Sequence, residues 1–154
     1  MLGTVDGLIL ASPRMNDENI RELPSDKPVV VINRDVKGIP GVVPDVDRGI
    51  SQAIQSLAAN GHSRILYVAG PVESWMSGWR WDGIKSASDW CRLQATLLRS
   101  ANPTVEGGRK AAQEVLASGV TAVLTYNDLL AIGLMQELQA ANVPVPDMIS
   151  ICGI

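Results

Sequence analysis

The chain has no phenylalanine and only two tyrosines, yet it carries four tryptophans among its 154 residues. It has one histidine, His62, and two cysteines, Cys91 and Cys152, which stand far apart without the spacing of metal ligands. Such cysteine usage argues against a disulfide framework and gives no support to a metal centre. We therefore expect reduced thiols, a cytoplasmic location, and neither metal nor cofactor.

Long apolar runs and an excess of basic residues are also missing. No run approaches the roughly 20 residues of a membrane span, and no signal-peptide pattern opens the sequence, so no membrane partner is expected. The net charge is −3, which argues against a nucleic-acid-binding face on this chain itself. His62 follows a helix-ending glycine and has no nucleophile at a recognisable elbow, so we expect a structural role and no enzyme activity.

Short apolar runs alternate with amphipathic segments along the chain. Strands are predicted at 5–11, 28–32, 42–43, 65–69, 92–98, 122–126 and 148–152, and helices follow most of them. This alternation predicts an α/β fold of parallel sheets joined by right-handed crossovers and flanked by helices.

The pattern restarts near Gly61–His62, so residues 1–61 are predicted to form a partial N-terminal lobe and residues 62–154 a partial C-terminal lobe. The chain opens straight into a strand and stops just after one. We therefore expect both ends to be cuts and both lobes to be incomplete.

The most informative stretch is residues 60–83, NGHSRILYVAGPVESWMSGWRWDG. Ser74, Ser77 and Arg80 follow its strand at three-residue steps, and ligands bind at the carboxyl ends of strands in open α/β sheets. The Arg80 guanidinium could clamp a sugar hydroxyl, a carboxylate or a phosphate. A surface ion pair with Asp82 or Glu73 explains Arg80 equally well.

Other polar residues also follow predicted strands. One of Asn127 and Asp128 is expected to cap the next helix, while the other is a candidate ligand contact. Asn33, Asp45 and Ser12 are candidates by position, although each could simply solvate a loop. Trp79 shares a helix face with Trp75, an arrangement that stacks on sugars or bases but more often serves a core or an interface.

Several segments stand in the order found in one known family: VDGLILASP, PVVVINR, LAANGHSRILYVAGP, TAVLTYNDLLAIGLMQEL and VPVPDMISICG. Together they strongly resemble the effector-binding core of lac repressor family (LacI/GalR-type) transcription regulators, over nearly the whole chain. The resemblance implies a periplasmic-binding-protein-like fold with a ligand cleft between two lobes. It also implies a homodimer that binds DNA only through an N-terminal helix-turn-helix outside this chain.

The resemblance also implies a function and a set of site residues. The core would sense a small-molecule effector, either a sugar or a nucleoside or purine, and alter the operator affinity of the absent headpiece. The alternative is a sugar-binding solute receptor of a transport system, and the residues upstream of Met1 would distinguish the two. Positions of the family cleft map onto Asn33, Asp45, Arg80, Asn127 and Asp128, with Met76 and Trp79 as lining residues.

Overall fold

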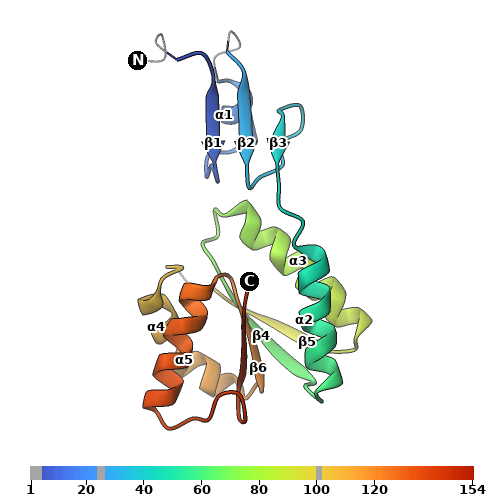
Figure 1. The fold of residues 1–154 in the computed structure, drawn as a ribbon, viewed down its shortest axis with the longest axis vertical. Helices are drawn as coiled ribbons and strands as arrows, with labels where there is room; N and C mark the ends of the chain where they lie inside the picture. The colour runs from blue at the N-terminus through green and yellow to red at the C-terminus, as the bar shows by residue number, and fades with distance from the viewer. Residues whose placement is uncertain (1–4, 24–26, 100–101) are drawn as a thin grey trace. The chain divides into compact units, whose positions relative to one another are not determined.

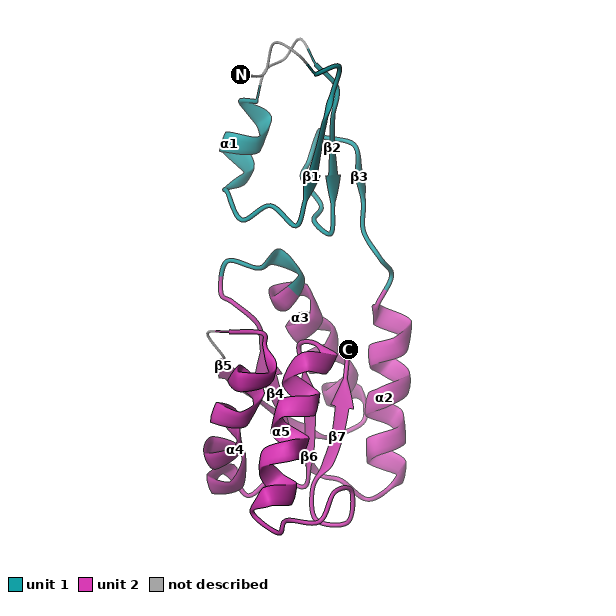
Figure 2. Cartoon of the chain, turned by 60° about the vertical axis from the view of Figure 1, so that its left-hand side comes forward, with its two compact units in different colours: residues 1–45, 73–76 teal, residues 46–72, 77–154 magenta. Residues whose placement is uncertain are grey.

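A computed structural model describes residues 5–23, 27–99 and 102–154 of the chain. It is an α/β structure with two parallel sheets (Figure 1). The chain divides into two compact units: unit 1 comprises residues 1–45 and 73–76, and unit 2 comprises residues 46–72 and 77–154 (Figure 2).

Unit 1 is a three-stranded parallel sheet with one short helix. Its strands, in the order β1-β2-β3, are Leu8–Ala11, Val29–Ile32 and Gly41–Val42, and α1 is Asp17–Arg21. The side-chain oxygen of Asn16 accepts a hydrogen bond from the Asn19 amide at 2.8 Å and so caps α1. A small core of Ile20, Val31 and Val36 joins this helix to the sheet.

Unit 2 is a four-stranded parallel sheet in the order β5-β4-β6-β7. Its strands are β4 (Arg64–Ala69), β5 (Gln94–Arg99), β6 (Ala122–Thr125) and β7 (Ser150–Gly153). Its helices are α2 (Asp47–Ala59), α3 (Trp75–Trp90, which begins in the segment grouped with unit 1), α4 (Val105–Ser118) and α5 (Asp128–Ala140).

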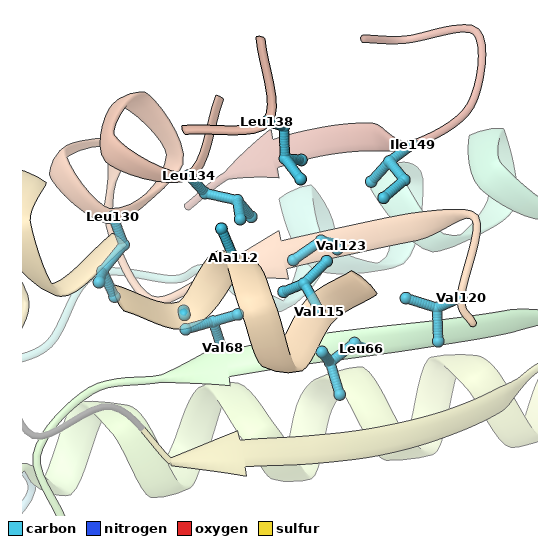
Figure 3. Packing of buried hydrophobic residues seen from close by; sticks show 11 residues of the cluster. Leu66, Val68, Ala112, Val115, Val120, Val123, Leu130, Leu134, Leu138 and Ile149 are labelled. Carbon is cyan, nitrogen blue, oxygen red and sulfur yellow. The ribbon is translucent and has the colours of Figure 1, made fainter. Parts of the chain in front are cut away.

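Alternate residues of β4 enter two separate cores, because successive side chains of a strand point to opposite faces. Leu66 and Val68 pack against α4 and α5, in a cluster that also contains Val115, Leu130 and Leu134 (Figure 3). Ile65 and Tyr67 pack on the other face. Helices thus cover both faces of the sheet, as a parallel sheet requires.

The division into units differs from the expected boundary at Gly61–His62. The chain divides between Asp45 and Val46, so α2 lies in unit 2. The reason is packing: Ile50 and Ile54 of α2 share a buried cluster with Ile65 and Tyr67 of β4. Asn60–Gly61 is only the end of α2, where Gly61 adopts a φ of +84°.

The structure confirms most predicted elements and shifts the ends of some. The strand predicted at 92–98 begins at Gln94, because Arg92 has a φ of 57° and lies in a turn. The final strand begins at Ser150, because the amide of Met148 donates to the carbonyl of Pro144 instead of joining a strand. Within the described residues, every helix is too short or too polar to cross a bilayer.

Candidate ligand-binding site

The carboxyl ends of the strands of unit 2 bring several predicted residues to one edge of the sheet. Parallel neighbours end on the same side, so Gly70 after β4 lies beside Tyr126 after β6, whose amide donates to Val68 at 2.8 Å. Helix α3 follows β4 and supplies Ser77 and Arg80 to this edge. Ser77 Oγ accepts a hydrogen bond from the Gly70 amide at 3.1 Å.

Arg80 is held at this edge by two contacts with Tyr126. Its Nη1 donates a hydrogen bond to the Tyr126 carbonyl, and its Cζ lies 4.9 Å from the centroid of the Tyr126 ring. The second contact has the geometry of a cation–π interaction. The Arg80 Nε is buried and has no hydrogen-bond partner among the described residues. The side chain thus presents an oriented guanidinium.

The alternative explanation of Arg80, a surface ion pair, finds no support within residues 5–23, 27–99 and 102–154. Salt bridges of the described residues include those of Arg34 with Asp17 and of Lys110 with Glu106, and neither involves Arg80. Neither Asp82 nor Glu73 pairs with Arg80.

Gly70 and Tyr67 shape the space around Arg80. A Cβ added to Gly70 would lie 2.7 Å from atoms of the Tyr126 ring, so only glycine allows the ring to pack there. Tyr67 is fully buried and stacks on Trp81, with ring centroids 6.2 Å apart. Burial raises the pKa of Tyr67 to about 12, while the nearby Ser77 hydroxyl and the charge of Arg80 partly counter that rise. Tyr67 is therefore neutral at ordinary pH, and its buried hydroxyl has no hydrogen-bond partner in good geometry among the described residues.

Asn127 takes the capping role expected of one member of the Asn127–Asp128 pair, and the ligand contact of Asp128 stays a prediction. The Asn127 Oδ1 accepts from the Leu130 amide at 3.0 Å and caps α5, while its Nδ2 donates to the Pro103 carbonyl at 3.0 Å. The predicted cap is therefore confirmed for Asn127. The exposed Asp128 has its carboxylate against the end of β7, where a Cβ on Gly153 would lie 2.1 Å from Asp128 Oδ1.

Unit 1 brings together a second pair of predicted residues. Ser12 follows β1 and Asn33 follows β2, and the Asn33 Nδ2 donates to the Ser12 Oγ at 3.0 Å. Their φ angles are 50° and 64°, a left-handed conformation that is uncommon for residues with a Cβ and is concentrated at functional sites. Arg34 instead fixes the neighbouring loop through Asp17 at 2.6 Å and the Met15 carbonyl at 2.7 Å.

The other predicted residues lie apart from these two groups or in different surroundings. Asp45 is exposed and follows β3 in unit 1. Ser74 directly precedes α3, and Met76 is buried in its first turn. Trp79 lines a groove between α2 and α3 whose lining does not include Arg80. His62 shares a hydrogen bond with Thr121 at 2.8 Å, at the amino ends of β4 and β6.

Tyr126 orients Arg80 in the candidate site, and the sequence analysis does not identify it. It lies between the strand residue Thr125 and the helix cap Asn127, so its pattern predicts only a strand. The signal that could have found it is its position directly before the Asn-Asp pair, at the carboxyl end of β6.

The sequence matches a known family over residues 3–153, nearly its whole length. That family comprises periplasmic binding proteins and the sugar-binding domain of the LacI family. The chain belongs to this family. The resemblance and the α/β fold class predicted from the sequence are thereby confirmed.

Curated relatives of this LacI-family chain are transcription regulators. It is 28% identical over 162 residues to the HTH-type transcriptional regulator GalS of Salmonella typhimurium, an alignment covering 96% of this chain and 46% of GalS. It is 29% identical over 156 residues to the HTH-type transcriptional repressor CytR of Escherichia coli, covering 97% of this chain and 46% of CytR. The chain thus spans about half the length of these relatives, which are regulators and not enzymes.

A solved structure shows the same fold. A LacI-family transcriptional regulator from Burkholderia phymatum superimposes with a TM-score of 0.85 at 27% identity. The match covers 96% of this chain and 56% of that protein.

Proposed function

We propose that the chain is the effector-sensing core of a LacI-family transcription regulator, and that Arg80 is its principal contact with a sugar, nucleoside or purine effector. The observation that carries this proposal is the orientation of the guanidinium at the carboxyl edge of the unit 2 sheet, maintained by the backbone and ring of Tyr126. Ligands bind at this edge in open α/β sheets.

The groups at this edge suit a polyhydroxylated ligand. A guanidinium donates two parallel hydrogen bonds to adjacent oxygen atoms, and the Asp128 carboxylate accepts hydrogen bonds from hydroxyl groups. Ser12, Asn33 and Asp45 of unit 1 stay predicted effector contacts, because each follows a strand of that unit. Ser74, Met76 and Trp79 stay predicted contacts, while Asn127 contributes by ordering the start of α5.

A ligand that binds one conformation of the sensing core more tightly than another shifts the population toward that conformation. In the proposed mechanism, that shift changes the geometry of a helix-turn-helix headpiece outside this chain and so changes operator affinity in the cytoplasm. The change in DNA affinity cannot exceed the ligand's differential affinity for the two states.

The regulator is proposed to act as a homodimer through α5. Leu129, Ile132 and Met135 follow one another at three-residue steps on α5 and are exposed by 48%, 39% and 36%. We call these three residues the α5 stripe. A second copy covering the α5 stripe would bury apolar surface on both partners through one self-complementary patch.

Fluorescence anisotropy with operator DNA tests the regulatory function. The full-length protein that carries this chain is titrated onto labelled DNA from its own promoter region, with and without a panel of sugars, nucleosides and purines. The proposal expects DNA binding that one member of the panel changes several-fold. Ligand binding without any DNA binding would favour the solute-receptor alternative. The absence of both ligand binding and DNA binding would contradict the regulator and the solute-receptor hypotheses alike.

A further inference from the structure

Unit 2 has a groove between α2 and α3 whose lining does not include Arg80, the residue on which the proposed effector site depends. Its volume is about 430 Å³, within the range of small-molecule pockets. One stripe of α2 lines it, with Asp47, Ser51 and Gln55 spaced four residues apart. The opposite side is lined by α3 and the residue that follows it: Trp79, Asp82, Gly83, Ser86, Ala87, Trp90 and then Cys91. We call this pocket the α2–α3 groove.

Small residues keep the α2–α3 groove open between two indoles. At Gly83 the helices approach so closely that a Cβ there would lie 3.3 Å from Asp47 Oδ1 and 3.5 Å from Ile50 Cδ1. Trp79 and Trp90 lie about three turns apart on α3, roughly 16 Å along the helix axis. The Trp90 side chain is 84% exposed, so its indole face is available to an occupant of the groove.

The charged groups of the α2–α3 groove are all of one sign. Asp47 and Asp82 contribute carboxylates, and no lysine, arginine or histidine lines the groove. Among the residues that the structure describes, no basic side chain lies within ion-pair distance of Asp82. Carboxylates together with indole faces favour a cationic ligand, because the face of an aromatic ring attracts positive charge.

We propose that the α2–α3 groove binds a small organic cation with an extended alkyl chain, such as a diamine or a polyamine. One ammonium group pairs with Asp82 and lies near Asp47. The methylene chain lies over Gly83 and Ala87, and a second ammonium group contacts the face of Trp90. The groove carries a charge opposite to that of the Arg80 edge, so the two sites select different ligands.

Isothermal titration calorimetry on the 154-residue chain tests the proposal with 1,6-diaminohexane. The neutral 1,6-hexanediol has the same chain length and serves as the matched ligand control. We expect saturable binding of the diamine below about 1 mM, a weaker response to the diol, and loss of affinity as ionic strength rises. Equal binding of the two ligands, or no saturable binding of the diamine, would overturn the proposal.

Two substitutions locate the ligand within the α2–α3 groove. Asp82→Asn is expected to weaken diamine binding about two- to fivefold, the size of an exposed ion pair. Trp90→Ala is expected to weaken it several-fold through the lost cation–π contact. Asp89→Asn removes a carboxylate of the same helix that does not line the groove, so affinity should stay unchanged. Equal effects of Asp82→Asn and Asp89→Asn would show nonspecific charge attraction and refute the site.

Alkylation of Cys91 provides a second readout at the other end of the groove. In a Cys152→Ser background, bound diamine should slow modification of Cys91 several-fold, and the diol should not. Undiminished alkylation at saturating diamine would place the ligand elsewhere. Arg80→Ala should leave diamine binding intact, so failure of this proposal and failure of the effector site can be told apart.

Discussion

At the scale of single residues, the candidate site depends on the packing of Tyr126 against Gly70. The ring occupies the space that any side chain at position 70 would need, and Arg80 is oriented by that same tyrosine. Position 70 therefore controls Arg80 although it carries no functional group of its own.

Gly70→Ala is expected to destabilise the protein by about 1–3 kcal/mol, because the new methyl group overpacks a buried contact. It should also weaken effector binding by displacing Tyr126 and, with it, Arg80. Urea unfolding and calorimetric titration measure the two effects. Unchanged stability would show that the ring moves aside without cost, contrary to the packing described.

Because the pKa of Tyr67 is raised, we expect the free energy of unfolding to depend on pH in the alkaline range. Its pKa is raised from 10.0 in the unfolded chain to about 12 in the fold, with burial as the largest cause. The folded state therefore keeps the phenol proton that the unfolded state loses. The contribution of the Tyr67 phenol to the free energy of unfolding is fully present below about pH 10. It is lost progressively as pH rises through about 12, by roughly 2–3 kcal/mol in all.

Urea unfolding of the wild type and Tyr67→Phe between pH 9 and 12 measures this contribution. The phenylalanine variant should lose less stability over that interval than the wild type. Parallel decline of the two proteins would mean that other groups cause the alkaline loss.

At the scale of elements, α4 and α5 cross at glycines. A Cβ on Gly133 of α5 would lie 1.9 Å from the Val105 carbonyl oxygen, and one on Gly108 of α4 would lie 2.2 Å from the Leu130 carbonyl oxygen. Backbone atoms cannot move aside as flexible side chains do. These glycines therefore set the distance between the helices and, with it, the position of Asn127 and Asp128 at the start of α5.

Gly133→Ala should destabilise the chain by about 3 kcal/mol or more, because the helices must separate. Gly49→Ala on α2 is the matched control, since no atom lies within 4 Å of its added Cβ. That variant should gain about 0.5–1 kcal/mol from the higher helix propensity of alanine. A stabilising effect at both positions in chemical denaturation would contradict the close helix crossing.

Local signals were the part of the structure that the sequence predicted well. Asn127 caps α5, as was expected of one member of the Asn127–Asp128 pair, because a cap depends on neighbours within a few residues. The contact of Arg80 with Tyr126 links distant parts of the chain, so no local pattern reveals it. The division into units differs from the expected boundary for the same reason: apolar periodicity predicts α2 but not the sheet on which it packs.

At the scale of the whole molecule, the α5 stripe predicts self-association of the chain. Ile132→Lys places a charge in the centre of that stripe and should convert a dimer of the 154-residue chain into a monomer, because burying an unpaired ammonium is costly. Analytical ultracentrifugation measures the mass. Gln52→Lys adds the same charge to an exposed position of α2 and should leave the dimer intact. A wild-type monomer, or a dimeric Ile132→Lys variant, would exclude this interface.

The central claim is that Arg80 contacts the effector, and calorimetric titration of the effector into Arg80→Ala tests it most directly. Arg48→Ala, which removes an exposed arginine of α2, is the matched control, and thermal unfolding verifies that both variants fold. We predict a loss of at least about tenfold in affinity for Arg80→Ala, the scale of a lost charged hydrogen bond, and no loss for Arg48→Ala. Wild-type affinity in a folded Arg80→Ala variant would contradict the claim.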